Sequence, residues 1–282
     1  MVFKFSIFKV IMFTFFIFYS QSAKASFERN FQSTLVKGRG LSGIASSQYE
    51  FVLLNPATIA QLQQSSISLS YTPSIFEIPE LSSTTIISAI PTEYGNIGAS
   101  FTTNGISLYR EMIGTLTYAK NFDGQYNVGV NINLQNLTIK NYGSTSVIGI
   151  DIGGSVNIVE NVRTGFSILN INRPTLGKIK DELPQVYSAG IEYMFASSAL
   201  ISLDMVKDVR YPLALRIGTD FSPHEIITVR FGMHNQPFKI HMQTSSYYGG
   251  ISIHYEFINF NYAVEMRNEL GITHSLGFSF SL

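Results

Sequence analysis

The chain has 282 residues, of which 45% are hydrophobic and only 13% are charged, whereas charged residues make up about 25% of a typical soluble domain. Lys+Arg and Asp+Glu number 19 each, and this zero net charge argues against a nucleic-acid binder, which carries a basic excess. Cys is absent, which excludes a disulfide scaffold, a Cys-ligated metal site and a thiol nucleophile. Such a composition predicts that part of the surface faces a medium other than water.

Residues 1–25 have the pattern of a secretory signal peptide. Lys4 and Lys9 accompany an apolar run, and the segment ends in Ser22-Ala23-Lys24-Ala25, which fits an A-x-A cleavage site. We expect cleavage after Ala25. The alternative is a membrane anchor, but the apolar run after Lys9 is shorter than the roughly 20 residues that a spanning helix needs.

Most of the chain after residue 64 alternates apolar and polar residues. Between residues 126 and 134, every second residue is Tyr, Val, Ile or Leu, and the residues between them are asparagines and a glycine. A period of two indicates a strand whose faces lie in different media. The length fits the roughly 9–11 residues of a transmembrane strand better than the roughly 5–6 of a globular one.

About fourteen such strands are predicted between residues 65 and 282. They lie near 65–71, 82–90, 94–102, 112–120, 126–138, 146–159, 162–170, 185–195, 199–207, 211–219, 225–233, 244–255, 257–266 and 270–282. The connections tend to alternate, long at 72–81 and 171–184 but short at 91–93 and 160–161. Outer-membrane barrels have long outer loops and short periplasmic turns, which places both chain ends in the periplasm.

The chain ends on a strand whose apolar face includes Phe280 and runs to Leu282. This ending resembles the C-terminal insertion signal of outer-membrane barrels. We therefore predict an all-β fold, a transmembrane antiparallel β-barrel of about 14 strands over residues 65–282. The barrel would lie in the outer membrane of a Gram-negative-type bacterium and contact its lipids. The alternative is a periplasmic all-β protein.

Residues 26–64 show no clean alternation. Gly38–Gly43 matches G-x-G-x-x-G letter for letter, but a dinucleotide site needs a surrounding βαβ unit. The sequence downstream predicts neither a crossover helix nor a parallel sheet. We interpret these glycines as flexible turns in a compact segment, without a cofactor.

Several motifs, in this order along the chain, resemble those of the FadL-like outer-membrane proteins. The N-terminal ones are Gly40-Leu41-Ser42-Gly43-Ile44-Ala45, Leu53-Leu54-Asn55-Pro56-Ala57 and Ile59-Ala60-Gln61-Leu62. Within the superfamily the chain is most similar to the PorV/PorQ-type branch, through Leu169-Asn170-Ile171-Asn172-Arg173-Pro174, Glu182-Leu183-Pro184, Gly190-Ile191-Glu192-Tyr193 and the ending Leu270-Gly271-Ile272-Thr273-His274-Ser275-Leu276. The resemblance covers essentially the whole mature chain. Where the family usually has two glycines followed by Ala, this chain has Ser42-Gly43-Ile44.

The resemblance implies that residues 26–64 form an N-terminal plug, or hatch, with Gly40, Gly43, Asn55, Pro56 and Ala57 as its motif. A barrel of fourteen strands is also too wide to be filled by its own wall side chains. Pro56 fixes φ and pushes Asn55 towards extended geometry. We predict that Asn55-Pro56-Ala57 is a structural turn that seats the plug, with direct ligand contact as the alternative.

The sequence lacks the usual catalytic and metal-binding motifs. The five histidines form neither H-x-x-x-H nor H-E-x-x-H, and no G-x-S-x-G is present. Charges of both signs alternate on the polar faces of neighbouring strands, which favours ion pairs in the lumen over a catalytic acid–base pair. They are Asp151, Arg163, Glu192, Asp204, Arg216, Arg230, His254, Glu256, Glu265 and Arg267. We predict no enzyme activity and no metal.

Three functional hypotheses remain. The resemblance implies passage of hydrophobic, fatty-acid-like small molecules, and Phe76 and Phe238 in two long outer loops are candidates for the ligand entrance. The equally open alternative for these residues is packing of the loops over the barrel mouth. A PorV-like role in type IX secretion would instead bind an exported or secretion-system protein on the outer loops. The third hypothesis is a purely structural barrel.

Overall fold

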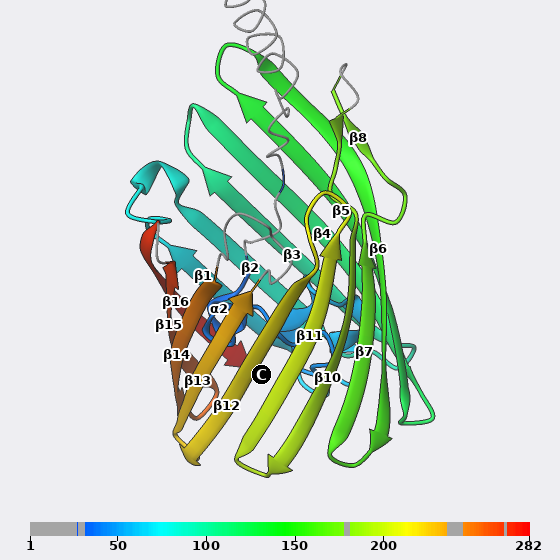
Figure 1. Ribbon diagram of the computed structural model, residues 1–282. Helices are drawn as coiled ribbons and strands as arrows, with labels where there is room; N and C mark the ends of the chain where they lie inside the picture. The colour runs from blue at the N-terminus through cyan, green and yellow to red at the C-terminus, as the bar shows by residue number, and fades with distance from the viewer. Residues whose placement is uncertain (1–26, 28–31, 178–180, 236–244, 268–269) are drawn as a thin grey trace, which may run out of the picture.

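The computed structural model describes Phe27 and residues 32–177, 181–235, 245–267 and 270–282. In this part of the chain, fourteen strands form a closed antiparallel barrel in which β1 pairs with β16 (Figure 1). The strands of the barrel are β1 (Ser66–Thr72), β2 (Ser83–Ile90), β3 (Asn96–Gly105), β4 (Tyr109–Phe122), β5 (Tyr126–Ile139), β6 (Gly143–Val159), β7 (Val162–Leu169), β10 (Val186–Ala196), β11 (Ala199–Asp208), β12 (Ala214–His224), β13 (Ile227–Asn235), β14 (Ser245–Tyr255), β15 (Ile258–Arg267) and β16 (Gly271–Ser281). The predicted all-β class and the predicted strand count are confirmed.

Some elements differ from the prediction. β4 covers Tyr109–Phe122 instead of 112–120, because ladder hydrogen bonds continue where the alternation fades. The connection between β7 and β10 holds a small hairpin of β8 (Thr175–Leu176) and β9 (Asp181–Glu182), and the connection after β1 holds a short helix, η3 (Pro79–Leu81). Elements this short carry no periodic signal in the sequence.

The barrel is polar inside and apolar outside. In β1, Ser66, Ser68 and Ser70 are buried, whereas Ile67 and Leu69 between them are 42% and 43% exposed. A globular protein in water has the opposite arrangement, with large apolar side chains buried. Alternation with a polar lumen and an apolar outer surface is the pattern of a barrel surrounded by lipid. Among the described residues, none of the helices has the length and apolar character needed to cross a membrane.

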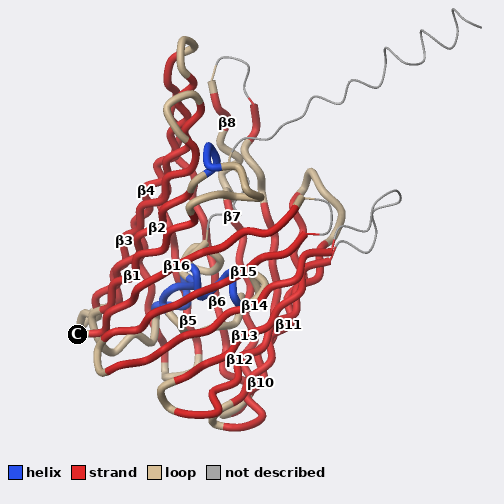
Figure 2. The backbone as a smooth tube through the Cα atoms, turned by 90° about the vertical axis from the view of Figure 1, so that its left-hand side faces the viewer, coloured by secondary structure: helices blue, strands red, loops and turns tan. Residues whose placement is uncertain are grey.

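The two ends of the barrel differ. At one end the connections are short turns such as 160–161 and 197–198, and there Leu282 N donates to Ser65 O at 2.8 Å, which brings the end of the chain to the start of the barrel. At the other end β4, β5 and β6, with 14, 14 and 17 residues, rise beyond the remaining strands (Figures 1 and 2). We call these the short-turn end and the long-loop end.

The described residues between 32 and 62 lie inside the barrel, where Figure 2 shows their short helices. They form α2 (Thr34–Gly38), η1 (Tyr49–Phe51) and η2 (Pro56–Ile59), and nearly all of them are buried. The Ser33 side chain caps α2 by accepting from Val36 N at 3.3 Å, and the Asn55 side chain caps η2. We call residues 32–62 the inner segment.

A row of small residues on the wall makes room for the inner segment. A Cβ atom added to Gly153 would lie 2.0 Å from Asn55 Oδ1, and one added to Gly232 would lie 2.3 Å from Gly40 N. Such distances cannot be occupied, so the close approach requires glycine at these positions. The other wall glycines that closely approach the inner segment are Gly98, Gly129, Gly165, Gly190, Gly218, Gly250 and Gly277. Several of them, such as Gly218 and Gly232, are directly opposite each other on neighbouring strands.

Candidate functional site

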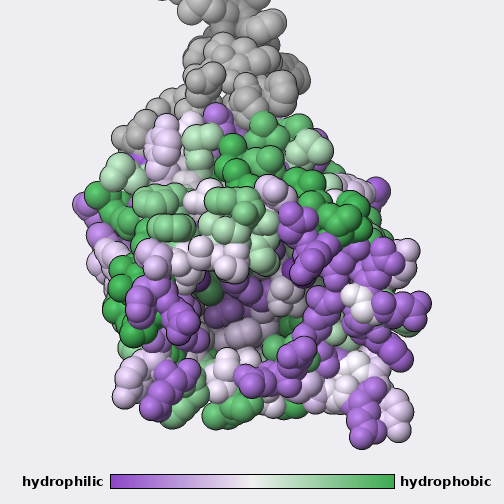
Figure 3. Space-filling view, turned by 90° about the horizontal axis from the view of Figure 1, so that it is seen from below, coloured by the Kyte–Doolittle hydropathy of each residue, from purple (hydrophilic) through white to green (hydrophobic). Residues whose placement is uncertain are grey.

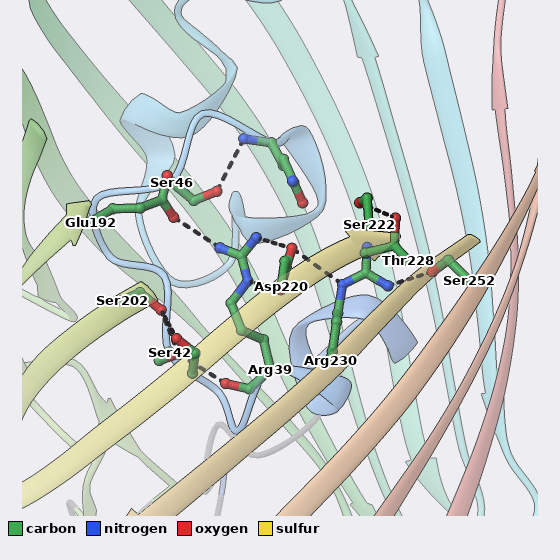
Figure 4. Close-up of polar contacts among 12 residues, drawn as sticks. Arg39, Ser42, Ser46, Glu192, Ser202, Asp220, Ser222, Thr228, Arg230 and Ser252 are labelled. Carbon is green, nitrogen blue, oxygen red and sulfur yellow. Dashed lines mark hydrogen bonds and ion pairs between the residues drawn. The ribbon is translucent and has the colours of Figure 1, made fainter. Parts of the chain in front are cut away.

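Arg39 is the centre of an ionic cluster between the inner segment and the wall (Figure 4). Its side chain is fully buried and donates to both carboxylate oxygens of Asp220, at 2.8 and 2.5 Å, and to Glu192 at 2.9 Å. Burial alone would lower the pKa of Arg39, but the two carboxylates outweigh it and the pKa is raised. The guanidinium also lies 4.7 Å from the centre of the Phe51 ring. Arg39 thus joins α2 to β10 and β12.

The chain after Arg39 is held by β11 and β12. Asp204 accepts from the backbone N–H groups of Gly43 and Ile44 at 2.6 and 3.1 Å. Arg216 donates to Leu41 O at 3.1 Å. The Oγ atoms of Ser42 and Ser202 lie 2.7 Å apart. These backbone and hydroxyl groups of the inner segment therefore find partners on the wall, as most buried polar groups do.

Two further charges of the inner segment are buried. Lys37 Nζ donates to the hydroxyls of Thr72 and Ser275 at 2.6 and 3.2 Å, and burial lowers its pKa to about 8, although Glu265 acts in the opposite direction. Burial raises the pKa of Glu50 to about 7, against the influence of the Arg230 and Arg39 guanidiniums. Seating this segment in the lumen therefore carries a desolvation cost that depends on pH.

Asn55 connects three parts of the structure. Its Oδ1 accepts from Ala57 N at 3.0 Å, and its Nδ2 donates to Ile44 O at 2.7 Å and to Gly154 O on β6 at 3.2 Å. Pro56 begins η2 and contributes no N–H. All the side-chain hydrogen-bonding atoms of the fully buried Asn55 are thus engaged by protein groups.

The structure also places most of the other residues that were predicted for the plug motif and the ligand entrance. Gly40 and Gly43 have φ values of 67° and 139°, which favour glycine, and Gly40 packs on Gly232. Phe76 is half-buried beside β16, where its N–H donates to Thr273 Oγ1 at 2.9 Å and its ring centre lies 5.0 Å from the Arg267 guanidinium. Phe238 and the cleavage position Ala25 lie outside the described residues.

The charges predicted on the lumen face make several ion pairs. Besides those of Arg39, Arg230 pairs with Asp220 at 3.4 Å, Arg163 with Glu192 at 3.9 Å and Arg267 with Glu265 at 2.8 Å. Asp220 and Arg39 were not among the predicted charges. The described residues contain no group of three or more His, Asp or Glu side chains placed to hold a metal ion.

An apolar cluster lies at the long-loop end of the barrel, and we call it the outer cluster. The buried side chains of Phe27, Leu137, Leu176 and Leu183 form its core, with Tyr109, Ile113, Ile139 and Val147 packed against them. Phe27 N donates to the buried Glu111 at 2.9 Å. Further into the barrel, the lumen face of β5 carries Asn131, Asn133 and Gln135 in place of apolar residues.

A second apolar cluster, the inner cluster, lies where the inner segment meets β2 and β4. Tyr49, Val52, Leu53, Ile59 and Ala60 of the inner segment pack on Ile87, Ala89 and Ala119 of the wall, with Leu62 beside them. Next to it, at the short-turn end, a cavity of about 620 Å³ is lined by Ala60, Leu62, Tyr94, Asn96 and Lys120 among others. Figure 3 views this end and shows hydrophilic side chains around a hollowed centre.

Comparison with known proteins places the fold. No family model and no curated protein matches the chain. Among solved structures, the CymD monoaromatic hydrocarbon channel has a TM-score of 0.69 at 14% identity, over 90% of this chain and 98% of that one. The toluene transporter TbuX of Ralstonia pickettii has a TM-score of 0.66 at 11% identity, over 90% and 99% of the two chains.

A FadL homologue of Pseudomonas aeruginosa is also similar, with a TM-score of 0.63 at 10% identity over 89% of this chain and 97% of that one. The chain therefore has the FadL-like barrel fold. The resemblance predicted from the sequence motifs is confirmed at this level, and none of these comparisons bears on the PorV/PorQ branch.

Proposed function

We propose that the protein is an outer-membrane β-barrel that passes hydrophobic small molecules. The outward face of the wall supports the membrane assignment, because exposed Ile, Leu, Phe and Tyr side chains alternate with buried Ser, Thr and Asn on strand after strand. Such a band is costly in water and is stabilised by lipid. The apolar C-terminal strand and the signal-peptide pattern of residues 1–25 agree with export to the outer membrane.

The outer cluster is the observation that carries the choice of cargo. The lumen of a barrel that conducts hydrophilic solutes is polar and filled with water. Here the lumen face of β4–β6 becomes apolar at the long-loop end, and Leu176 and Leu183 cover it. A largely apolar group of side chains beside a buried carboxylate, Glu111, has the chemical character of a small-molecule site. The aromatic ring of Phe27 occupies it in this structure.

We assign to the inner segment the role of the plug predicted for residues 26–64, in which it would close the lumen to water. Its ionic cluster, its hydrogen bonds to the wall and the glycine row fit it closely to the barrel. The neighbouring folds agree, since CymD is a monoaromatic hydrocarbon channel and TbuX is a toluene transporter. No contact or surface among the described residues favours the protein-handling alternative.

The test is uptake of a neutral aromatic hydrocarbon such as toluene by cells that carry the protein in their outer membrane. Leu137→Asn with Leu183→Asn places two amides among the apolar side chains of the outer cluster and should lower uptake about ten-fold. Phe260→Ala is the matched control, because its ring packs on Phe278 on the lipid side of the barrel, at 5.3 Å between ring centres.

The control should lower stability and leave uptake unchanged. Equal uptake by the Leu137/Leu183 variant and the wild type, at equal amounts of folded barrel, would refute the site. If cells with and without the wild-type protein take up toluene equally, the proposed function itself is wrong.

A further inference from the structure

The inner segment contacts the wall in two chemically different ways. Towards β10, β11, β12 and β16 the contacts are ion pairs and hydrogen bonds, from Arg39, Gly43, Ile44 and Lys37. Towards β2 and β4 they are the apolar contacts of the inner cluster. Hydrogen bonds on this side of the described residues include those from Asn96 Nδ2 to the carbonyls of Ile59 and Leu62, at the short-turn end of β3, and the one from Asn131 Nδ2 on β5 to Val52 O at 3.1 Å.

Strand β4 joins the two apolar clusters. Ile113, towards its long-loop end, packs against the outer cluster, and Ala119, towards its short-turn end, belongs to the inner cluster. Between them on the same face, Thr115 and Thr117 donate their hydroxyls sideways to Asn133 and Asn131 at 2.8 and 2.7 Å. The hydroxyls of both threonines are therefore engaged along the wall.

The wall is closed on this side of the barrel. β3 pairs with β2 from Ile97 to Asn104 and with β4 along its whole length, without a break in register. An unbroken hydrogen-bonded ladder leaves no gap through which a molecule could pass sideways into the lipid. A molecule that moves along the inner face of β4 is therefore led towards the short-turn end.

The cavity of about 620 Å³ lies at that end of the inner cluster, since Ala60 and Leu62 line the cavity and also belong to or pack against the cluster. The remainder of its lining includes Gln61, Asn96 and Lys120. A polar, water-exposed cavity directly beside an apolar contact is suited to release a molecule into water rather than to retain it.

In the inner cluster, side chains of the inner segment meet Ile87, Ala89 and Ala119 of the wall, and we call this contact the seam. We propose that apolar cargo travels along the inner face of β4, passes through the seam and leaves into the periplasm at this cavity. The assignment rests on the proposed function and names its route and exit. Opening the seam separates apolar side chains whose contacts the apolar cargo can replace. Opening the opposite side of the inner segment would leave buried charges without their partners. Ala89 and Ala119 are the small wall residues that set the width of the seam.

The absence of cysteine from the chain allows a direct test with single thiols. Ala119→Cys places a thiol in the seam, and Ala263→Cys places one on β15, on the inner wall near Gly38 and away from the inner cluster. Both alanines are buried, at 0% and 1% exposure. Intact cells are treated with N-phenylmaleimide, a neutral aromatic thiol reagent, with and without excess toluene.

The expected result is labelling at position 119 at least about ten-fold faster than at position 263, slowed by toluene, with toluene uptake falling in proportion to the labelled fraction. If Ala119→Cys does not yield a heat-modifiable barrel, Ala89→Cys on β2 probes the same seam from its other edge. Equal labelling at the seam and at position 263, or no labelling of the seam, would overturn the route while wild-type toluene uptake still upheld the proposed function. Absence of wild-type uptake would overturn both.

Discussion

Replacing Arg39 by Met should release the inner segment from the wall. The substitution keeps an unbranched apolar side chain over Phe51 but removes the donors to Asp220 and Glu192. Breaking a buried ion pair by removing one partner costs about 3–5 kcal/mol, because the other charge stays buried. Arg230 at 3.4 Å from Asp220 and Arg163 at 3.9 Å from Glu192 still face these carboxylates, so we expect the lower end of this range.

A loss of about 3 kcal/mol shifts the balance between seated and released inner segment more than a hundred-fold towards release. A fourteen-stranded barrel without this segment encloses water. The purified Arg39→Met protein should therefore show frequent ion-conducting openings in planar bilayers, where the wild type is mostly closed. Arg39→Lys should be intermediate, because it keeps the charge but loses the two-pronged contact with Asp220.

Arg110→Met is the control, since this arginine is exposed on β4 and its loss should leave conductance unchanged. The reasoning is refuted if Arg39→Met inserts as a heat-modifiable barrel and its conductance equals that of the wild type. In that case the ionic cluster would not hold the inner segment, and apolar packing and hydrogen bonds alone would seat it.

Other perturbations give distinct outcomes. Burial raises the pKa of Glu50 to about 7, so its stabilisation of the seated inner segment is full below its ordinary pKa of about 4.5 and is lost as pH rises to about 7. Wild-type openings should therefore increase over this window, and Glu50→Gln should reduce the increase. In Gly153→Ala the new Cβ would lie 2.0 Å from Asn55 Oδ1, so this substitution should cost about 1–3 kcal/mol of seating free energy and raise conductance. Gly114→Ala is the control, because a Cβ there meets nothing within 4 Å, and it should leave conductance unchanged. Phe76→Ala should change toluene uptake by less than about two-fold, because the ring packs on an arginine rather than in the outer cluster. A five-fold loss would instead support the predicted place of Phe76 at the ligand entrance.

The barrel wall could be predicted from the sequence because each strand carries its own evidence. In a strand with one face in lipid and one in the lumen, the alternation is local and needs no knowledge of neighbours, as in Ser66–Thr72 with its strict buried-exposed pattern. The ends of the strands could be predicted less closely, because strand residues outside the lipid need not alternate between apolar and polar. β8 and β9, with two residues each, could not be recognised by any periodicity.

The contacts inside the lumen could not be predicted in the same way, because they join residues far apart in the chain. Arg39 appeared as one letter of a glycine-rich turn, and its partner Asp220 lies 181 positions away. The outer cluster was missed for the same reason, since Phe27 lies beside Leu137 only in the folded chain.

The sequence does carry one signal for the inner segment. Gly129 and Gly153 fall on the polar faces of their predicted strands, in alternation with apolar residues. Glycine weakens a strand unless a close backbone approach requires it. A glycine on the inner face of one strand after another could therefore have indicated a segment packed against the wall.

Selective uptake tests the central claim most directly. Cells carrying the wild-type protein in the outer membrane, and cells lacking it, are compared for uptake of toluene and of a hydrophilic solute of similar size, such as glycerol. An apolar outer cluster above a closely fitted inner segment predicts faster entry of toluene and unchanged entry of glycerol. Equal acceleration of both solutes would mean an open water-filled pore, and acceleration of neither would mean that the barrel does not conduct small molecules.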